Sequence, residues 1–566
     1  MKKNLFSIGL CFSTIFAGYS HQTDVKTRTA IQLEANKDVP TYFISTPNMD
    51  QIKAEDALSS RKGDRYRIGV GTYVNITAQN SGLWTTLPSG DKMWQLKIKN
   101  PGAVSLSFVF NTFKLANGSS FWVEDLKGEK VSKVLTKEDM LEDFQQNIAH
   151  CFSDEVILTL IDQQYATSSE LRLDRVFYNY RFQRHFGNAK INESDASCEV
   201  NINCTEGANY QDEKRGVAMV DIFEGADEFV CTGSVVNNLA QDCKPLMLTA
   251  LHCGVSTSAS DMVLWKFYFN YEAPACTNPT SVGTLLSHYV NSCVRLSDAG
   301  DNGGDSGSDF LLLQMGTLAN EAATITALKS ASINAYWNGW DANNVASAAG
   351  VGIHHPAGDI KKISTYSSTL VSDTYGGQVQ NTHWRITWVA TANGHGVTEG
   401  GSSGSPLFTY NGGSSRIVGT LTGGSSYCTA TSDPDLYGKV AYHWQSNGTT
   451  ANRRLKNFLD PNNTGTLVLN GSANPCSLTG VNELTANSTD IKLYPNPITD
   501  KLSIDLTSLT DEVIITIYDI SGKLISTSNY NAGSIVNLDL NGMTQGIYSI
   551  QIKSGDVNLV KRISKI

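Results

Sequence analysis

The sequence of 566 residues contains few charged side chains, and those it has form no basic cluster. Lys, Arg, Asp and Glu together make up 17% of the chain, and the formal net charge is −10. Proteins that bind nucleic acids usually present a basic patch to the phosphate backbone. The composition therefore gives no support for a nucleic-acid partner.

Long apolar runs are also scarce. The main one, from Leu5 to Ala17, follows a start with two lysines and precedes small polar residues. This arrangement is typical of a secretory signal peptide, and the run is too short for a membrane anchor. We expect residues 1–21 to be removed from an exported protein.

No Cys-x-x-Cys pair is present among the 11 cysteines. Setting aside Cys11 in the signal peptide leaves an even number, which in an exported chain favours disulfides over zinc. The spaced acidic residues at 301–308 fit no EF-hand loop, so calcium dependence stays open. We predict no metal ligands and no cofactor.

The remaining chain is too long for a single core and divides by composition. Residues 22–191 are rich in alternating apolar segments, which predicts a β-rich propeptide or else an attached binding domain. Residues 192–460 alternate short apolar strands with Gly/Ser/Asn turns, which is typical of an all-β barrel protein. A polar linker at 461–490 and a small C-terminal β-sandwich at 491–566 complete the prediction.

The candidate nucleophile lies in the sequence Gly-Gly-Ser-Ser-Gly-Ser-Pro at 400–406. Glycines on both sides allow a sharp turn and the close approach of a substrate carbonyl. We assign Ser403 as the nucleophile, with the backbone N–H groups of Gly401 and Ser403 as the oxyanion hole.

A histidine and an aspartate, each at the end of an apolar strand, supply the other catalytic groups. His252 follows the strand at 246–250, and Asp309 precedes the strand at 310–313. In this assignment His252 takes the proton of Ser403, and Asp309 fixes the imidazole tautomer. The order His, Asp, Ser is that of the chymotrypsin arrangement.

A second serine, Ser306 in Gly-Asp-Ser-Gly, looks more like the nucleophile loop of trypsin. However, too few residues separate it from His252 to complete one barrel and enter the second. We therefore interpret 301–308 as the turn that delivers Asp309.

Taken together, these motifs resemble those of the bacterial lysyl endopeptidases, a secreted branch of the chymotrypsin-fold serine proteases. The resemblance implies a double β-barrel, with a β-rich prodomain before it, and His354 and His355 as landmarks rather than metal ligands. It rests on Cys-Thr-Gly-Ser at 231–234, Thr-Ala-Leu-His-Cys at 249–253, Ser-Asp-Phe at 308–310, Trp-Asn-Gly-Trp-Asp at 337–341, Ile-His-His-Pro at 353–356, Val-Thr-Glu-Gly-Gly-Ser-Ser-Gly-Ser-Pro at 397–406 and Asp-Leu-Tyr-Gly-Lys-Val at 435–440.

The resemblance also implies a pocket for a basic side chain with Asp435 at its base. A buried cation needs such a carboxylate, and the residue six before Ser403, where trypsin has its acid, is Val397. Thr422, Gly423 and Gly424 would line the strand that pairs with the substrate. The family carries histidine at the position of Thr422 and tryptophan at that of Tyr375, so cleavage after lysine alone or after both lysine and arginine stays open.

Three disulfides are implied by the resemblance: Cys198–Cys428, Cys204–Cys276 and Cys231–Cys253. A fourth between Cys243 and Cys293 is a further guess, and Cys151 and Cys476 are left unpaired.

Ser402 precedes the nucleophile where trypsin has an aspartate, so a new N-terminus cannot activate the site by pairing there. We expect the prosegment to inhibit sterically and to be cleaved near Lys190 or Arg184.

The C-terminal segment, with Leu-Tyr-Pro-Asn-Pro at 493–497, a Gly-Ile-Tyr strand and a basic end, resembles the type A sorting domain of the type IX secretion system of Bacteroidetes. It implies export through the periplasm and outer membrane, to the cell surface or medium.

The resulting prediction is a secreted serine endopeptidase, monomeric when mature, that acts on protein or peptide substrates. The alternatives are a protease of another P1 preference and a catalytically silent surface adhesin with the same fold.

Overall fold

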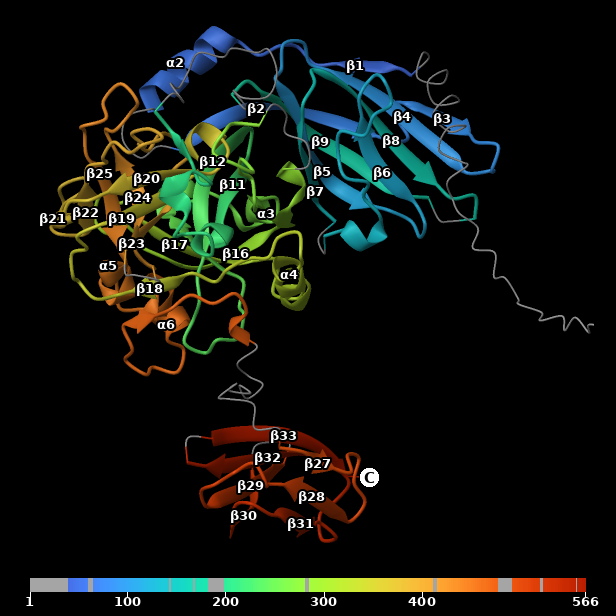
Figure 1. Cartoon of the computed structure of the whole chain (residues 1–566). Helices are drawn as coiled ribbons and strands as arrows, with labels where there is room; N and C mark the ends of the chain where they lie inside the picture. The colour runs from blue at the N-terminus through green and yellow to red at the C-terminus, as the bar shows by residue number, and fades with distance from the viewer. Residues whose placement is uncertain are drawn as a thin grey trace, which may run out of the picture.

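The structure, a computed structural model, describes residues 39–59, 65–141, 144–165, 168–181, 198–279, 285–410, 415–476, 491–519, 523–555 and 557–565. The predicted signal peptide and the expected cleavage sites at Arg184 and Lys190 lie outside these residues. In the part of the chain described, no helix is long and apolar enough to span a bilayer. Strands dominate every region, which confirms the all-β prediction (Figure 1).

The N-terminal domain, residues 39–181, is a sandwich of two sheets, with the α-helix α2 (Met49–Ser59) between the first two strands in chain order. The first sheet contains β1 (Thr41–Phe43), β3 (Leu83–Thr86), β4 (Lys92–Lys99), β6 (Ser120–Glu124) and β8 (Glu155–Asp162). The facing layer contains β2 (Tyr66–Thr77), β5 (Ser105–Lys114), β7 (Gln146–Cys151) and β9 (Glu170–Asn179). Phe110, Phe113 and Phe121 meet edge to face in the core between them.

The first six residues of β5, Ser105 to Phe110, are all buried, although two of them are serines. Leu106, Phe108 and Phe110 face the sandwich core. Val109 faces the other way and packs with Phe223 and Leu264 of the next domain. The N-terminal domain is therefore docked on its neighbour through the outer face of its second sheet.

The two domains also share backbone hydrogen bonds. Strand β2 pairs antiparallel with β12 (Asp227–Val235), from Tyr66 opposite Val230 to Val70 opposite Asp227. This pairing joins the N-terminal sheet and the first barrel into one 11-stranded sheet.

The first barrel closes through a bend at Ser292. Its seven strands are β11 (Val217–Glu224), β12, β13 (Leu246–Ala250), β17 (Phe310–Met315), β16 (Cys293–Asp298), β15 (Tyr289–Asn291) and β14 (Lys266–Tyr268), and β14 pairs back with β11. Ser292, with φ of 69°, lies between β15 and β16 and turns the chain from one to the other. The interior is filled by apolar side chains such as Val220, Leu248 and Leu312.

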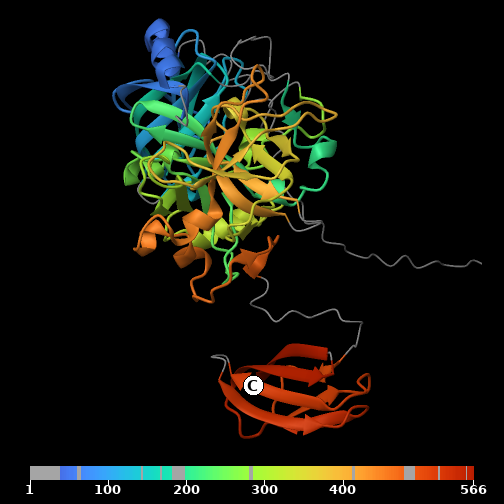
Figure 2. The same ribbon diagram turned by 90° about the vertical axis from the view of Figure 1, so that its left-hand side faces the viewer.

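The second barrel faces the viewer in Figure 2. Its path runs β10 (Val200–Asn201), β20 (Lys362–Tyr366), β19 (Gly350–His354), β23 (Pro406–Thr409), β24 (Arg416–Gly424), β25 (Asp435–Lys439), β22 (His383–Ile386) and β21 (Val371–Asp373). A hydrogen bond from the Val389 N–H to the Thr365 carbonyl (2.9 Å) links the segment after β22 back to β20. Helices α5 (Val440–Gln445) and α6 (Lys456–Leu459) follow the last strand.

The predicted linker at 461–490 starts too early, because residues up to 476 pack on the barrels. Strand β26 (Val468–Leu469) pairs with β18 (Gly339–Asp341). Cys476 then forms a disulfide with Cys243. The guessed pairing of Cys243 with Cys293 is therefore wrong, and Cys293 is a buried free cysteine beside the Met262 carbonyl.

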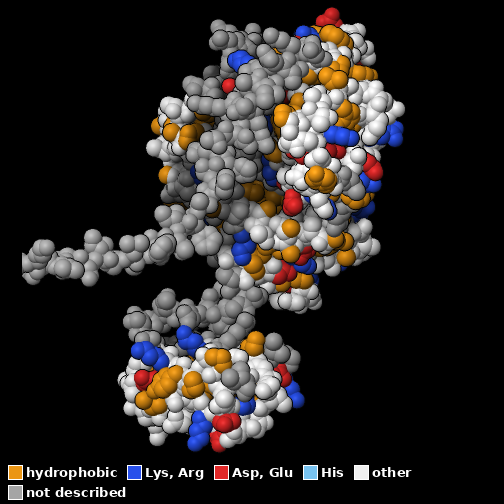
Figure 3. Space-filling view, turned by 90° about the vertical axis from the view of Figure 1, so that its right-hand side faces the viewer, with side chains coloured by type: hydrophobic (Ala, Val, Ile, Leu, Met, Phe, Trp, Pro, Cys, Tyr) orange, Lys and Arg blue, Asp and Glu red, His pale blue; other side chains and the backbone are white. Residues whose placement is uncertain are grey.

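The C-terminal domain, residues 491–565, has a core of its own around Ile504, Ile515 and Ile550. It contains two sheets: β27 (Leu493–Tyr494), β28 (Lys501–Asp505) and β31 (Ile535–Asp539), and β29 (Val513–Asp519), β30 (Leu524–Tyr530), β32 (Gly546–Ser554) and β33 (Val557–Lys565). On the face drawn in Figure 3, hydrophobic side chains form small scattered groups, including some on this domain.

A group of ionisable side chains is buried between the N-terminal domain and the first barrel. His150 of β7 lies 3.2 Å from the Asp221 carboxylate (Nε2 to Oδ2), and Asn179 of β9 donates to Glu228 (2.7 Å). Burial raises the pKa of Asp221 to about 7 and that of Glu228 to about 8. Burial lowers the pKa of Lys266 to about 8 and that of His150 to about 4. The docked interface therefore favours protonated carboxyl groups.

Once the connection at 182–197 is cut, the N-terminal domain is expected to dissociate more readily as the pH rises from 6.5 to 8. The raised pKa values of Asp221 and Glu228 stabilise docking at low pH, and this stabilisation is lost as the pH passes through 7 to 8. His150 opposes the trend only below its ordinary pKa near 6.5, and Lys266 only above its shifted pKa near 8. With about one proton taken up on docking, the dissociation constant should rise roughly tenfold per pH unit.

Gel filtration of the cleaved protein across this pH range would measure the change. Glu228→Gln replaces the carboxyl group with an amide that is neutral at every pH. The dissociation constant of this variant should therefore change less with pH than that of the wild type. A wild-type profile that is already flat would contradict the interpretation.

Candidate active site

Ser403 lies in a tight turn that is pressed against the end of β13. Gly401 and Gly404 have φ of 94° and 78°, which favour glycine. A β-carbon at Gly404 would lie 2.1 Å from the Thr249 hydroxyl, so no side chain fits there. The Thr232 N–H donates to the Ser403 carbonyl (2.8 Å), which holds the second-barrel turn on the first barrel.

His252 and Asp309 are brought together by the pairing of β13 with β17. Ala250 is opposite Phe310 in this ladder, so the residues just beyond it are neighbours. Asp309 Oδ2 lies 2.7 Å from His252 Nδ1, and Asp309 Oδ1 accepts from the His252 backbone N–H (2.9 Å). Because a carboxylate only accepts, the proton sits on Nδ1 and the Nε2 lone pair is left as a base.

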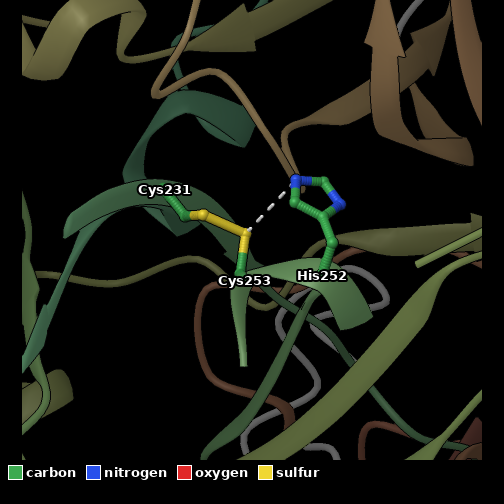
Figure 4. A group of neighbouring side chains, drawn as sticks. All are labelled: Cys231, His252 and Cys253. Carbon is green, nitrogen blue, oxygen red and sulfur yellow. Dashed lines mark hydrogen bonds between the residues drawn. A yellow bond between two sulfur atoms is a disulfide. The ribbon is translucent and has the colours of Figure 1, made fainter. Parts of the chain in front are cut away.

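The disulfide between Cys231 and Cys253 lies beside the histidine (Figure 4). Cys253 Sγ is 4.0 Å from His252 Nε2 and 3.8 Å from the Ser403 carbonyl oxygen, so one sulfur touches both candidate catalytic residues. Cys231, His252 and Cys253 together have the composition of a metal site, but the two sulfurs are bonded to each other at 2.05 Å. The cluster therefore offers no thiolate ligand, and the disulfide ties the His252 segment to β12.

The backbone N–H groups of Gly401 and Ser403 are oriented by the carbonyl groups at the other ends of their peptide units. The Gly400 carbonyl accepts from the Ala357 N–H (2.6 Å), and the Ser402 carbonyl accepts from the Ser405 N–H (2.9 Å). In the part of the chain that the structure describes, neither the Gly401 nor the Ser403 N–H has an acceptor. Two adjacent donors without acceptors suit the charge of a tetrahedral intermediate.

Ser306 is exposed in the turn that precedes Asp309. Asp301 organises this turn by accepting from the backbone N–H groups of Gly304 (3.2 Å) and Asp309 (2.8 Å). Burial and the Asp309 carboxylate raise the pKa of Asp301 to about 6.

Asp435 lies on β25, opposite Gly424 of β24, and is fully buried. Its Oδ2 accepts from Trp388 Nε1 (2.6 Å), Thr398 Oγ1 (2.7 Å) and Ser426 Oγ (2.6 Å). From the described residues its Oδ1 accepts a single long bond, from the Ser426 N–H (3.3 Å), and it lies 1.9 Å from where a β-carbon of Gly424 would be. Glycine at 424 therefore leaves the space beside Oδ1 on the β24 side free of a side chain, and burial raises the pKa of the carboxyl.

A cleft extends from His252 along both barrels. Its lining includes Tyr375, Gly424, Leu436 and, from the N-terminal domain, Arg65. Arg65 is held there by an ion pair with Glu224 (2.6 Å) and by contact with the Phe229 ring.

Thr422 is buried and forms a hydrogen bond with His383, a histidine that the sequence analysis did not identify. His383 Nε2 lies 2.9 Å from Thr422 Oγ1, and the Tyr375 ring lies 5.5 Å from the imidazole. Gly423 follows at a bulge in β24. Burial lowers the pKa of His383 to about 4. His383 lies in a short strand and is not part of a recognisable sequence motif, so no local pattern pointed to it.

The two landmark histidines are buried and hydrogen-bonded within the protein. His354 Nδ1 lies 2.8 Å from Ser402 Oγ, and His355 Nδ1 lies 2.9 Å from the Asp359 carbonyl. Among the described residues, neither belongs to a cluster with the composition of a metal site.

The structure also contains the three disulfides that the family resemblance implies: Cys198–Cys428, Cys204–Cys276 and Cys231–Cys253.

Comparison with known proteins gives two family matches. Residues 191–438 match the model of the lysyl endopeptidase C-terminal domain, and residues 492–565 match that of the secretion system C-terminal sorting domain. A lysyl endopeptidase of Pseudomonas aeruginosa is 31% identical over 246 residues, which cover 42% of this chain and 47% of the relative. The chain thus spans about half the length of that relative.

Two solved structures are also similar. They are a thermostable serine protease, AL20, from an extremophilic microorganism (15% identity) and the protease Anisep from Arthrobacter nicotinovorans (18% identity). Each match covers 40% of this chain and 91% of the other, with a TM-score of 0.28.

The sorting domain confirms the prediction of export. The family matches confirm the resemblance found in the sequence: residues 191–438 are similar to the C-terminal domain of the lysyl endopeptidases, and residues 492–565 are similar to the secretion system C-terminal sorting domain.

Proposed function

We propose that the chain is the precursor of a secreted serine endopeptidase that cleaves after lysine. The observation that carries this proposal is the His252–Asp309 pair, which meets the Ser403 turn at the Cys253 sulfur, together with the two N–H groups without acceptors. An adhesin that had lost catalysis would have no need to keep all of these groups in register.

In the proposed reaction Ser403 Oγ attacks the substrate carbonyl, and His252 Nε2 takes the hydroxyl proton. The N–H groups of Gly401 and Ser403 stabilise the oxyanion, and Asp309 stabilises the imidazolium. The imidazolium then protonates the leaving amine. Water, activated by the same histidine, hydrolyses the acyl-enzyme on Ser403.

The hydrogen bonds of Asp435 favour lysine over arginine. A guanidinium pairs best with both oxygens of a carboxylate, but three donors already occupy Oδ2. An ammonium can use Oδ1 together with the lone pairs of Thr398 Oγ1 and Ser426 Oγ, since these hydroxyl protons point to Asp435. A protease with another P1 preference is the second candidate, which the loss of the family histidine at Thr422 keeps open.

The N-terminal domain fits the role of an inhibitory propeptide. Arg65 lines the cleft beside His252, and a β-carbon at Gly400 would lie 2.6 Å from the Tyr66 ring. The start of β2 therefore crosses the nucleophile turn, where it would obstruct a protein substrate. After export by the type IX secretion machinery, separation of this domain would leave a monomeric protease.

The test is digestion of an unfolded protein by the processed enzyme, with the cleavage sites mapped by mass spectrometry. Wild-type enzyme is expected to cut after lysine, with arginine sites cut at least tenfold more slowly. Ser403→Ala is expected to lose about 10⁴-fold or more in rate, because the nucleophile is gone.

Ser306→Ala, in the other Gly-Asp-Ser-Gly sequence, is the matched control and should retain wild-type activity. Cleavage that survives Ser403→Ala would sink the proposal. Cleavage after other residue types would be consistent with the proposed mechanism but would contradict the proposed specificity for lysine.

A further inference from the structure

Ser402, the residue before the nucleophile, is fully buried and belongs to a chain of hydrogen bonds that the reaction itself does not use. Its Oγ lies 2.8 Å from His354 Nδ1, and the other ring nitrogen, Nε2, lies 2.9 Å from Ser364 Oγ. His354 ends β19 and Ser364 lies in β20, so the chain ties the nucleophile turn to two adjacent strands of the second barrel.

The direction of the bonds in this chain follows from its Val397 end and from a neutral imidazole ring. At one end the Glu399 N–H, which can only donate, donates to Ser402 Oγ (3.3 Å). At the other end the Val397 carbonyl, which can only accept, accepts from Ser364 Oγ (2.9 Å). The Ser364 proton is thus used, and its oxygen accepts from His354 Nε2–H.

His354 Nδ1 is then an acceptor, and the Ser402 hydroxyl donates to it. This assignment requires a neutral imidazole with its proton on Nε2. The burial of His354, together with the charge of Lys362, lowers its pKa to about 3, which agrees with a neutral ring. The chain is therefore complete at neutral pH, with each hydroxyl and ring nitrogen satisfied.

The location of Ser402 gives this chain a consequence for catalysis. Ser402 lies between Gly401 and Ser403, whose N–H groups form the candidate oxyanion hole. Its carbonyl fixes the Ser403 peptide unit through the Ser405 N–H (2.9 Å), and its side chain is held by His354. A fixed Ser402 therefore restrains the Ser403 N–H directly and the Gly401 N–H through the residue between them.

Resting on the proposed endopeptidase function, we propose that His354 is a positioning residue that holds the oxyanion hole open through the Ser402 hydroxyl. This neutral hydrogen-bond chain replaces an ion pair between a new N-terminus and the residue before the nucleophile. The oxyanion hole is consequently formed before processing, and removal of the N-terminal domain uncovers the cleft without rebuilding it.

The test uses the full-length, unprocessed chain and a small phosphorylating reagent, diisopropyl fluorophosphate. Ser403 Oγ attacks phosphorus, fluoride leaves and His252 takes the proton, while the phosphoryl oxygen occupies the oxyanion hole. Intact-mass spectrometry follows the rate of modification. Wild-type chain is expected to react at Ser403 at a rate within about threefold of the processed enzyme, because the oxyanion hole already exists.

Ser402→Ala and His354→Gln are each expected to slow this reaction by about 10-fold to 100-fold, less than the loss of an oxyanion donor outright. In processed enzyme the same variants should lower kcat by a similar factor and leave KM within about twofold, because ground-state binding does not use the oxyanion hole. The double variant should react no more slowly than the slower single variant, since both changes break one chain.

His395→Gln is the matched control. It removes a half-buried histidine from the segment that leads to the nucleophile, where its Nδ1 contacts only the neighbouring Gly396 carbonyl (3.0 Å). It should react like the wild type. Thermal unfolding of each variant identifies one that fails to fold, and Ser402→Ala, which removes a single oxygen, remains informative if His354→Gln does not fold.

The outcomes separate the inference from the function on which it rests. A processed wild-type enzyme whose Ser403 never reacts would remove the proposed protease itself. A reactive processed enzyme with Ser402→Ala and His354→Gln at the wild-type rate would overturn the inference alone. So would unprocessed chain that is inert toward the reagent while the processed enzyme reacts.

Discussion

Asp309→Asn is expected to lower kcat about 10⁴-fold, with little change in KM. One oxygen of Asp309 accepts a hydrogen bond from the His252 backbone N–H, and a backbone N–H can only donate. The asparagine must keep its carbonyl oxygen there, so its NH₂ group faces Nδ1. The ring is then forced to carry its proton on Nε2, where it cannot accept the proton of Ser403.

Steady-state kinetics on a lysine ester or amide would measure this effect, with Asp341→Asn on β18 as a carboxylate-to-amide control outside the site. The loss should shrink at alkaline pH if hydroxide replaces the missing base. A loss below tenfold would show that the Asp309 carboxylate does not set the tautomer of His252.

Asp435→Asn is expected to lower kcat/KM for lysine substrates by roughly 10²-fold to 10³-fold or more, the cost of leaving a buried cation without its partner. Trp388, Thr398 and Ser426 all donate to Oδ2, so the asparagine must place its oxygen at that position. Its NH₂ group then takes the place of Oδ1 and faces the lysine ammonium with N–H donors. The new group is therefore repulsive as well as uncharged.

Matched peptides with lysine or its uncharged analogue norleucine at the cleavage position would isolate the charge effect. Wild-type enzyme should prefer lysine, and the variant should lose that preference while cleaving the norleucine peptide at a rate near that of the wild type. Equal losses on both peptides would mean that Asp435 supports the pocket structurally and does not bind the substrate charge.

Local patterns in the sequence were sufficient to locate the residues that the structure brings together at the site. His252 and Asp309 each flank an apolar strand, and the pairing of those two strands places them side by side. The glycines around Ser403 likewise predict a tight turn, and the structure leaves no room for side chains at these glycines. In these cases short stretches carry the information, because each strand end and each turn is specified by its own residues.

Contacts between distant segments could not be predicted from these local patterns. The disulfide from Cys243 to Cys476 joins residues 233 positions apart, and β26, which leads to it, is only two residues long. His383 reaches Thr422 only because β22 and β24 both flank β25. Both contacts depend on which strands pair across the barrel, and a single sequence does not encode that choice in any local pattern.

The pairing of β2 with β12 also bears on the order in which the molecule assembles. From Asp227 to Val230 this edge of β12 is covered by β2, which lies far upstream in the chain. Synthesis from the N-terminus makes the covering strand before the barrel strand that needs it, and domains generally form in that order. The N-terminal domain is thus available as a template while the first barrel folds. A barrel that folds without it would expose this sheet edge, which carries Glu228, while its other strands are still forming, and an unpaired edge at that stage invites pairing with other chains.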